Sequence, residues 1–328
     1  MTPIVPILSL RQLRLGIQYP HGTLEIVRGV DLDVMAGEKL ALVGESGSGK
    51  TLTILSVLRL LPPPVEALSG SVAYDGQELL ALAEPGLRAV RGGQIAMVYQ
   101  DPMSSLNPLL RIGTQLVEAL TAHGRGRNEA RRLALSGLAE VALPEPERVM
   151  SAYPHELSGG MLQRVMIAMA LSTSPRVLIA DEPTTALDVT IQEQILRLVG
   201  DLQARRHMAV IWVTHDLGVV ARLVDRVAVM YAGRVVEQAP TVDLFRRPEH
   251  PYTAALLASL PGPAAEHRAV LRQIGGAPPD PAHLPGGCPF RTRCPSADGR
   301  CAAEEPGLLE RAPDRSAACW KRPDEWAS

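Results

Sequence analysis

Hydrophobic and polar positions alternate over residues 24–34 (LEIVRGVDLDV), and a short unbroken apolar run follows at 39–43 (KLALV). Alternation with a period of two predicts a half-buried strand, and a short continuous apolar run predicts a fully buried one. A third apolar stretch, over 51–61, predicts a helix that ends before three consecutive prolines. The pattern therefore predicts two strands, a loop and a helix in succession.

Short apolar runs alternate with amphipathic stretches farther along the chain. They predict further strands at 71–75, 94–99, 177–180, 209–213 and 227–231, and helices at 158–172 and 191–205. Strands that alternate with helices predict an α/β fold whose sheet is mostly parallel and covered by helices on both faces. Between about 106 and 149 the pattern turns helical and is interrupted by Gly and Pro, which indicates a helical insertion.

The last part of the chain differs from the rest in composition. Beyond about Leu244 it is rich in Pro, Gly and Arg, and all four cysteines lie within the last 41 residues. We therefore predict a main domain over residues 1–243, with a helical insertion at about 105–160. A small cysteine-containing extension is predicted over residues 244–328.

Charge and hydropathy limit the partners of the protein. The net charge of −2 gives no electrostatic reason to expect nucleic acid as a partner. No apolar run approaches the ~20 residues needed to span a bilayer. The first residues lack the basic start and apolar block of a secretory signal. We expect a soluble cytosolic protein that reaches a membrane only by docking on a partner.

One glycine-rich loop lies between the predicted buried strand and the following helix. Its sequence fits G-x-x-x-x-G-K-[ST] and comprises Gly44, Glu45, Ser46, Gly47, Ser48, Gly49, Lys50 and Thr51. Glycines let successive backbone N–H groups point inward as an anion site at a helix N-terminus. Lys50 would supply charge for the β- and γ-phosphates of a nucleotide, and Thr51 a hydroxyl for Mg²⁺. Only three lysines occur in the chain, so one inside this motif is informative.

The predicted buried strand at 177–180 ends in two carboxylates, Asp181 and Glu182. Ligands bind at the carboxyl ends of parallel strands, so we expect both carboxylates beside the phosphate loop. Asp181 would hold the Mg²⁺ shell. Glu182 would polarise the attacking water as a general base. Together with the phosphate loop, this predicts a catalytic and not merely structural role.

A third motif, Leu157-Ser158-Gly159-Gly160-Met161 followed by Gln163-Arg164, resembles the signature of the ABC ATPases. Adjacent glycines at a helix start expose backbone N–H groups and bring the helix dipole to bear on an anion. The resemblance implies a P-loop cassette with a parallel sheet core, an antiparallel β subdomain and a helical subdomain. It also implies ATP and Mg²⁺ as cofactors, and that Ser158, Gly159 and Gly160 contact ATP held by a second subunit.

The same resemblance implies roles for single residues. Gln100 occupies the position of a glutamine that contacts Mg²⁺ and water, and His215 that of a histidine that contacts the γ-phosphate. Asp188, in Ala186-Leu187-Asp188, matches the D-loop at the dimer seam. Tyr19 lies upstream of the phosphate loop, where an aromatic ring often stacks on adenine, with simple packing as the alternative.

Longer segments narrow the resemblance to the ATPase subunits of oligopeptide, dipeptide and nickel importers. They are LIADEPTTALDVTIQ, THDLGVVA, VMYAGRVVE and HPYTAALLASLP. This likeness implies a motor that works with two transmembrane permeases, a second ATPase subunit that is a paralogue or another copy, and an extracytoplasmic solute-binding protein. The alternative is a non-transport ABC ATPase, acting in phosphonate metabolism or on ribosomes or DNA. The transported solute is not specified by the sequence.

The cysteines Cys288, Cys294, Cys301 and Cys319 are separated by five, six and seventeen residues. Disulfides are not expected in a cytosolic chain, and the gaps lack the paired C-x₂-C spacing usual for structural zinc. Four thiolates can hold a [4Fe–4S] cluster, which some members of the resembling family carry. Zinc and unligated thiols remain the alternatives.

Overall fold

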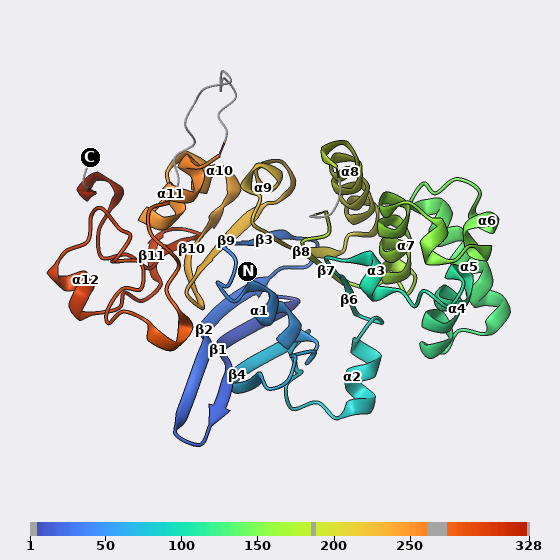
Figure 1. Ribbon diagram of the computed structural model, residues 1–328, viewed down its shortest axis with the longest axis horizontal. Helices are drawn as coiled ribbons and strands as arrows, with labels where there is room; N and C mark the ends of the chain where they lie inside the picture. The colour runs from blue at the N-terminus through green and yellow to red at the C-terminus, as the bar shows by residue number, and fades with distance from the viewer. Residues whose placement is uncertain (1–4, 185–187, 261–273, 327–328) are drawn as a thin grey trace. The chain divides into compact units, whose positions relative to one another are not determined.

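The computed structural model describes residues 5–184, 188–260 and 274–326, and every structural statement below concerns those residues. The chain divides into two compact units, which we describe separately (Figure 1). The first unit comprises Met1–Met35, Lys39–Leu80 and Val213–Ser328, and the second comprises Ala36–Glu38 and Ala81–Trp212.

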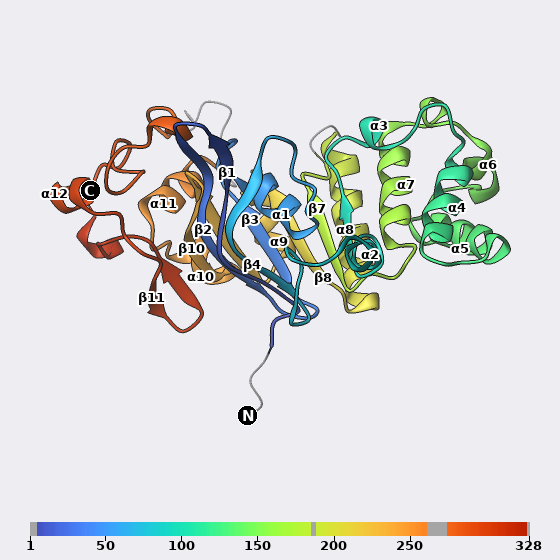
Figure 2. The same ribbon diagram turned by 90° about the horizontal axis from the view of Figure 1, so that it is seen from below.

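An antiparallel sheet with the strand order β2-β1-β4-β5 lies in the first unit (Figure 2). Its strands are β1 (Leu8–Tyr19), β2 (Gly22–Val34), β4 (Glu66–Tyr74) and β5 (Gln77–Glu78). β2 confirms the strand predicted at 24–34. β1 was not predicted, although its buried leucines Leu8, Leu10, Leu13 and Leu15 largely alternate with more exposed residues. A register irregularity after Leu10 interrupts that alternation and weakens the pattern.

The first unit also contains strands in the order β3-β9-β10-β12-β11. They are β3 (Lys39–Val43), β9 (Arg226–Tyr231), β10 (Arg234–Pro240), β12 (Arg315–Ala317) and β11 (Leu309–Ala312). β3 pairs parallel with β9, and the other pairs are antiparallel. Because Glu237 of β10 pairs with Ala317 of β12, the end of the chain extends this sheet.

The helices of the first unit are α1 (Lys50–Val57), α9 (Leu217–Leu223), α10 (Thr241–Arg246), α11 (Pro251–Ala258) and α12 (Gly299–Ala303). Two 3₁₀ turns lie at Pro281–His283 and Pro323–Glu325. The helix predicted over 51–61 ends at Val57, four residues early. The physical reason is that Arg59 adopts a left-handed conformation (φ 50°), which an α-helix cannot continue through.

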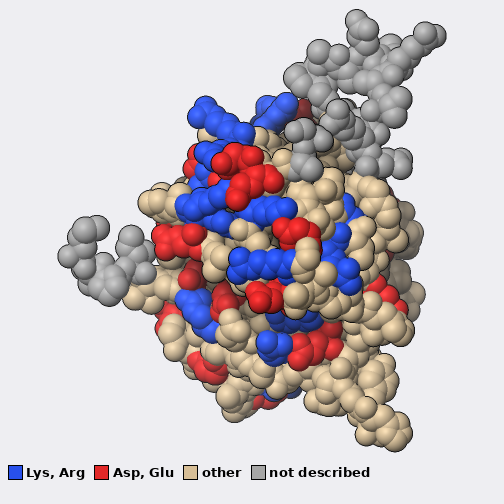
Figure 3. Space-filling view, turned by 90° about the vertical axis from the view of Figure 1, so that its left-hand side faces the viewer, with Lys and Arg blue, Asp and Glu red and all other residues tan. Residues whose placement is uncertain are grey.

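Basic and acidic side chains are interspersed on the face that carries the C-terminal extension (Figure 3). Several ion pairs involve the residues after Leu244, and two of them lie near the end of the chain. Arg28 Nη2 lies 2.8 Å from Glu305 Oε1, and Lys321 Nζ lies 3.1 Å from Asp298 Oδ2. The first pair joins β2 to the C-terminal segment, so charge as well as strand pairing holds the end of the chain to the rest of the first unit.

The second unit contains β6 (Ile95–Val98), β7 (Val177–Asp181) and most of β8 (Ala209–Thr214), in the order β8-β7-β6. All five residues of β7 are buried, as its unbroken apolar run predicted. The helices are α2 (Glu84–Val90), α3 (Pro102–Ser105), α4 (Ile112–Ala122), α5 (Arg127–Glu140), α6 (Pro146–Ser151), α7 (Gly159–Leu171) and α8 (Val189–Arg206), with a 3₁₀ turn at Pro154–Glu156. The helical stretch predicted between 106 and 149 is formed by α4, α5 and the start of α6, which pack against one another (Figure 1).

Gly233, in the turn between β9 and β10, yields a stability prediction. Its φ is +79°, and a Cβ placed there would lie 2.1 Å from the carbonyl oxygen of Ile26. We expect Gly233→Ala to lower the free energy of unfolding by more than about 3 kcal/mol, because the penalty of a left-handed alanine and that of the backbone collision add together. Gly76→Ala is the matched control, because its φ is +78° with nothing within 4 Å, and it should cost about 1–2 kcal/mol. Urea unfolding midpoints compare the two, and equal losses would contradict this explanation.

Candidate nucleotide-binding site

The phosphate loop runs from the end of β3 to the start of α1, as predicted. Gly44, Gly47 and Gly49 have φ values of 151°, 79° and 98°. A Cβ on Gly44 would lie 2.2 Å from the carbonyl oxygen of Met230, so a larger residue has no room there. Gly49 is the N-cap of α1, and its conformation turns the chain into the helix. The glycines therefore give the loop a path that other residues could not follow.

Lys50 begins α1 and is only 6% exposed. Its Nζ donates hydrogen bonds to the carbonyl oxygens of Gly44, at 2.8 Å, and Glu45, at 3.0 Å. The ammonium group is thus held across the loop by the loop's own carbonyls. Thr51 follows in the first turn of α1 and is exposed. The motif thus lies between a buried strand and a helix, as predicted, and the roles of Lys50 and Thr51 toward a nucleotide and Mg²⁺ stay predictions.

His215 and Tyr19 belong to the same unit and are both exposed. His215 lies between β8 and α9, directly before Asp216, whose carboxylate accepts hydrogen bonds from the N–H groups of Gly218 and Val219 at the start of α9. Tyr19 is 54% exposed at the end of β1, where it pairs with Gly22. Exposure leaves both rings accessible to a ligand, but their roles remain predictions.

In the second unit, β7 ends at Asp181, which is 7% exposed, and Glu182 follows directly. Glu182 adopts a left-handed backbone conformation with φ of 44°, unusual for a residue with a side chain. Gln100 follows β6, the strand next to β7, and its Nε2 donates a 3.2 Å hydrogen bond to Glu182 Oε2. The structure therefore joins two residues that are 82 positions apart. Glu182 was predicted to act on the attacking water, and Gln100 on that water and Mg²⁺.

The signature motif forms the start of α7. Ser158 is its N-cap, and its Oγ accepts a 3.4 Å hydrogen bond from the N–H of Met161. Ser158 and Gly159 are exposed. A Cβ on Gly160 would lie 2.9 Å from a side-chain carbon of Ile191, so glycine permits close packing of α7 on α8.

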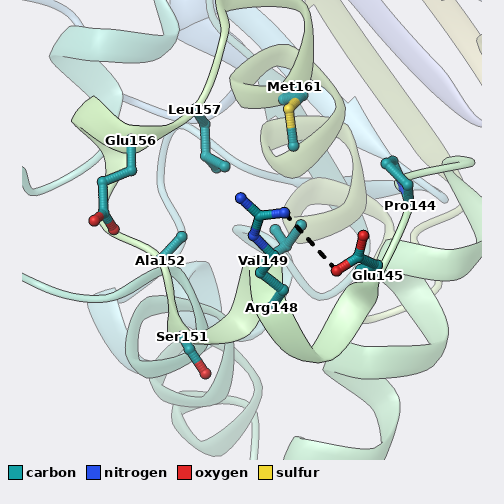
Figure 4. Close-up of a pocket in the computed structure, with 9 residues that line it drawn as sticks. All are labelled: Pro144, Glu145, Arg148, Val149, Ser151, Ala152, Glu156, Leu157 and Met161. Atoms are coloured by element: carbon teal, nitrogen blue, oxygen red, sulfur yellow. Dashed lines mark ion pairs between the residues drawn. The ribbon is translucent and has the colours of Figure 1, made fainter.

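Asp188 is the N-cap of α8 and accepts a 3.0 Å hydrogen bond from the N–H of Ile191. This contact brings the end of the predicted D-loop next to the signature motif, since Ile191 also packs on Gly160. Residues 186 and 187 of that loop lie outside the described residues. A surface pocket of about 460 Å³ lies beside the motif, with Leu157 and Met161 among the residues that line it (Figure 4).

Comparison with known proteins decides the family. A family model for ABC transporters matches residues 27–185, and a model for the oligopeptide/dipeptide transporter C-terminal region matches residues 236–301. The chain belongs to the ABC transporter family. It is one of the ATP-hydrolysing cassettes of that family, and its C-terminal region is of the oligopeptide/dipeptide transporter type.

Curated relatives resemble this ABC cassette over nearly its whole length. The dipeptide transport ATP-binding protein DppD of Bacillus subtilis is 46% identical over 96% of this chain and 94% of that protein. The oligopeptide transport ATP-binding protein OppD of Escherichia coli is 45% identical over 97% and 94%. The predicted alternative of a non-transport ATPase finds no support in these names.

Solved structures agree on the fold. The ATP-binding cassette MJ0796, in a dimeric post-hydrolysis state bound to ADP and Pi, has a TM-score of 0.64 and 29% identity. The match covers 71% of this chain and 98% of that one. The ABC cassette predicted from the sequence motifs is thereby confirmed.

The four cysteines lie together in the extension, where all of them line one small cavity. The backbone N–H of Cys288 donates a 2.8 Å hydrogen bond to the carbonyl oxygen of Cys301. Burial raises the pKa of the Cys288 thiol to about 11, and burial also raises the pKa values of Cys294 and Cys319. Within the described part of the chain, no group of three or more His, Cys, Asp or Glu side chains is arranged to hold a metal ion. The structure gives the predicted cluster no direct support.

Sequence reasoning missed two residues that contact the phosphate loop. Tyr252 Oη accepts a 2.8 Å hydrogen bond from the N–H of Glu45, and the guanidinium group of Arg293 forms an ion pair with the Glu45 carboxylate. Tyr252 belongs to the segment HPYTAALLASLP, which resembles the importer family, but the sequence of that segment does not predict this contact. Arg293 lies 248 positions from Glu45, and no pattern in the sequence connects them.

Glu182→Gln should leave MgATP binding intact and reduce hydrolysis ~10²-fold or more, because it removes a base but keeps an oxygen that can accept from Gln100. Steady-state phosphate release and nucleotide titration measure the two effects. Glu193→Gln is the control, since Glu193 is a surface residue of α8 paired with Arg197. Wild-type turnover in Glu182→Gln would refute the assignment of the base.

Proposed function

We propose that this cassette is the ATP-hydrolysing subunit of an importer for peptides. The observation that carries the proposal is the likeness, over 96% or more of the chain, to proteins named for dipeptide and oligopeptide transport. The match of residues 236–301 to the C-terminal region of such transporters adds a second, independent support. Peptides are the proposed cargo class.

The residues of the ATP motifs take roles that follow from their chemistry. Lys50 neutralises charge on the β- and γ-phosphates, and Thr51, Gln100 and Asp181 provide oxygen ligands for Mg²⁺ and its water. Glu182 accepts a proton from the attacking water. The bond from Gln100 to Glu182 orients that carboxylate. His215 donates to the γ-phosphate, and Tyr19 stacks on the adenine ring.

A second ATPase subunit, either a paralogue or another copy, completes the hydrolytic site. Support comes from the exposure of Ser158 and Gly159, whose motif is the start of a 13-residue helix. The N-terminus of a helix favours an anion, and an exposed one can serve a nucleotide held by a neighbouring molecule. Asp188 lies at the same surface and faces the same partner.

A groove in the second unit is the proposed docking site for a short cytoplasmic helix of a permease. It has a volume of about 190 Å³ and is lined in part by Tyr99, Leu106, Ala119 and Met166. Its lining is largely apolar. Tyr99 directly precedes Gln100, so movement of a docked helix would shift Gln100, which bonds to Glu182. Tyr99 is the exposed member of this lining, at 39%, whereas Leu106 and Met166 lie below it in the core. An exposed aromatic side chain over an apolar floor is suited to contact with a partner.

Two such permeases and an extracytoplasmic solute-binding protein complete the proposed importer. No helix among the described residues is long and apolar enough to cross a bilayer. We propose that its permeases hold the cassette at the cytoplasmic face of the membrane, and the relatives named as transport ATP-binding proteins support this.

Proteoliposomes that contain the permeases and both ATPase subunits test this function directly. With ATP enclosed, and the binding protein and a labelled oligopeptide outside, we expect the peptide to accumulate inside. Glu182→Gln should abolish accumulation, and Glu193→Gln should preserve it. Accumulation that does not depend on ATP, or none for any peptide offered, would contradict the proposed function.

For the extension we propose a [4Fe–4S] cluster held by Cys288, Cys294, Cys301 and Cys319. The thiols line one cavity, and thiolate sulfur is the donor that such clusters require. The raised pKa of Cys288 means that its thiol is protonated at neutral pH until a metal displaces the proton. A bound cluster would supply a covalent cross-link to a segment with little apolar core.

Protein purified without oxygen should be brown and carry about four iron and four sulfide per chain, with absorption near ~400 nm. Changing any one of the four cysteines to Ser should remove most of the iron. Ser296→Ala, a change beside Cys294 that leaves every thiol in place, should not. Stoichiometric zinc without iron, or no metal at all, would overturn the cluster and leave the ATPase function unaffected.

A further inference from the structure

The guanidinium group of Arg293 makes a two-bonded ion pair with a residue inside the phosphate loop. Arg293 Nη1 lies 2.7 Å from Glu45 Oε2, and Nη2 lies 2.9 Å from Glu45 Oε1. The Arg293 side chain is 3% exposed and that of Glu45 24%. Paired, parallel hydrogen bonds to a carboxylate fix both its position and its orientation, which a single charge contact does not.

Arg293 is itself held from several sides. Its Nε donates a 2.9 Å hydrogen bond to the carbonyl oxygen of Gly275, and its guanidinium lies 5.8 Å and 5.9 Å from the ring centres of Tyr231 and Phe290. Such cation–aromatic contacts are strongest when the cation is shielded from water. The ion pair with Glu45 raises the pKa of Arg293 further, so its charge is permanent.

A buried aromatic cluster supports both partners. Tyr231, Tyr252 and Phe290 are at most 2% exposed, with ring centres 4.5 to 5.4 Å apart. The chain has only two Phe and six Tyr residues, so three of eight gather at this point. Tyr252 Oη also accepts a hydrogen bond from the N–H of Glu45, so the aromatic cluster contacts the phosphate loop directly as well as through Arg293.

The segment that bears Arg293 is the one that bears the cysteines. Arg293 directly precedes Cys294, and Phe290 lies two residues after Cys288. Farther along the loop, Ser46 and Gly47 line a small cavity together with Pro278 and Pro279, which precede this segment. The cysteine segment (residues 286–301) thus reaches the phosphate loop through the contact of Arg293 with Glu45.

Charge gives the ion pair a functional consequence. Glu45 places a carboxylate within a loop whose task is to bind a polyanion, and like charges at close range repel. Arg293 neutralises that carboxylate. We propose that Arg293 is a positioning residue for nucleotide binding, which holds and neutralises Glu45 and thereby makes the affinity for MgATP depend on the cysteine segment. This inference rests on the nucleotide-binding role of the loop, not on the identity of the transported solute.

Calorimetric titration of the full-length chain with a non-hydrolysable MgATP analogue tests the proposal. Arg293→Ala should weaken affinity roughly tenfold, the scale of one charge-assisted interaction. Turnover at saturating ATP should stay within about twofold, because Arg293 does not touch the residues predicted to react. Arg291→Ala is the matched control, since Arg291 belongs to the same segment but bonds to the carbonyl oxygen of Gly286.

The double variant separates positioning from packing. Adding Glu45→Gln to Arg293→Ala removes the unpaired carboxylate, so the double variant should bind the analogue more tightly than Arg293→Ala alone. Raising the salt concentration should also narrow the gap between Arg293→Ala and the wild type, because it screens the repulsion. Arg293→Lys keeps the charge but loses the paired hydrogen bonds, so its affinity for the analogue should lie between those of the wild type and Arg293→Ala. This variant keeps the proposal testable if Arg293→Ala does not fold.

Two results would overturn the proposal. One is equal weakening by Arg293→Ala and Arg291→Ala, which would mean that any loosening of the segment has the same effect. The other is a double variant no tighter than Arg293→Ala at any salt concentration. Wild-type protein that binds no nucleotide would instead refute the ATPase assignment, so the two failures are distinguishable.

Discussion

A loop that binds a triphosphate through its backbone must hold successive N–H groups in one direction, and the first unit is organised around that constraint. Gly44 has no room for a side chain because the carbonyl of Met230 lies against it. Gly233 donates its N–H to the carbonyl of Ser48 and is packed as tightly against Ile26. The conformation of the loop is thus fixed by β9 and by the turn that follows it, and not by the loop sequence alone.

The second unit carries the residues expected to act on water and on a neighbouring nucleotide. Its buried strand β7 ends at Asp181, Glu182 follows directly, and Gln100 donates a hydrogen bond to the Glu182 carboxylate. The left-handed backbone of Glu182 is a strained conformation, which is maintained at functional sites by the packing around it. The signature motif at the start of α7 is exposed at Ser158 and Gly159, and its role toward a second subunit is a proposal.

The sequence predicted the motif residues well because their chemistry is local. Gly44–Thr51, Asp181 and Ser158 each lie in a short segment whose spacing and flanking pattern specify strand, loop and helix, and the structure places them there. The contact between Arg293 and Glu45 could not be predicted, because it depends on how the chain returns after 248 residues. β1 was missed because an irregular register breaks its alternation, and the early end of α1 depends on one left-handed residue.

Hydrogen–deuterium exchange of the full-length chain measures most directly whether the phosphate loop and the cysteine segment respond together to bound nucleotide. On adding a non-hydrolysable MgATP analogue, amides of residues 44–51 should exchange more slowly, and those of residues 286–301 should slow over the same range of ligand concentration. Helix α5, which belongs to the other unit, provides the internal reference. Protection of the loop with unchanged exchange in residues 286–301 would contradict the account.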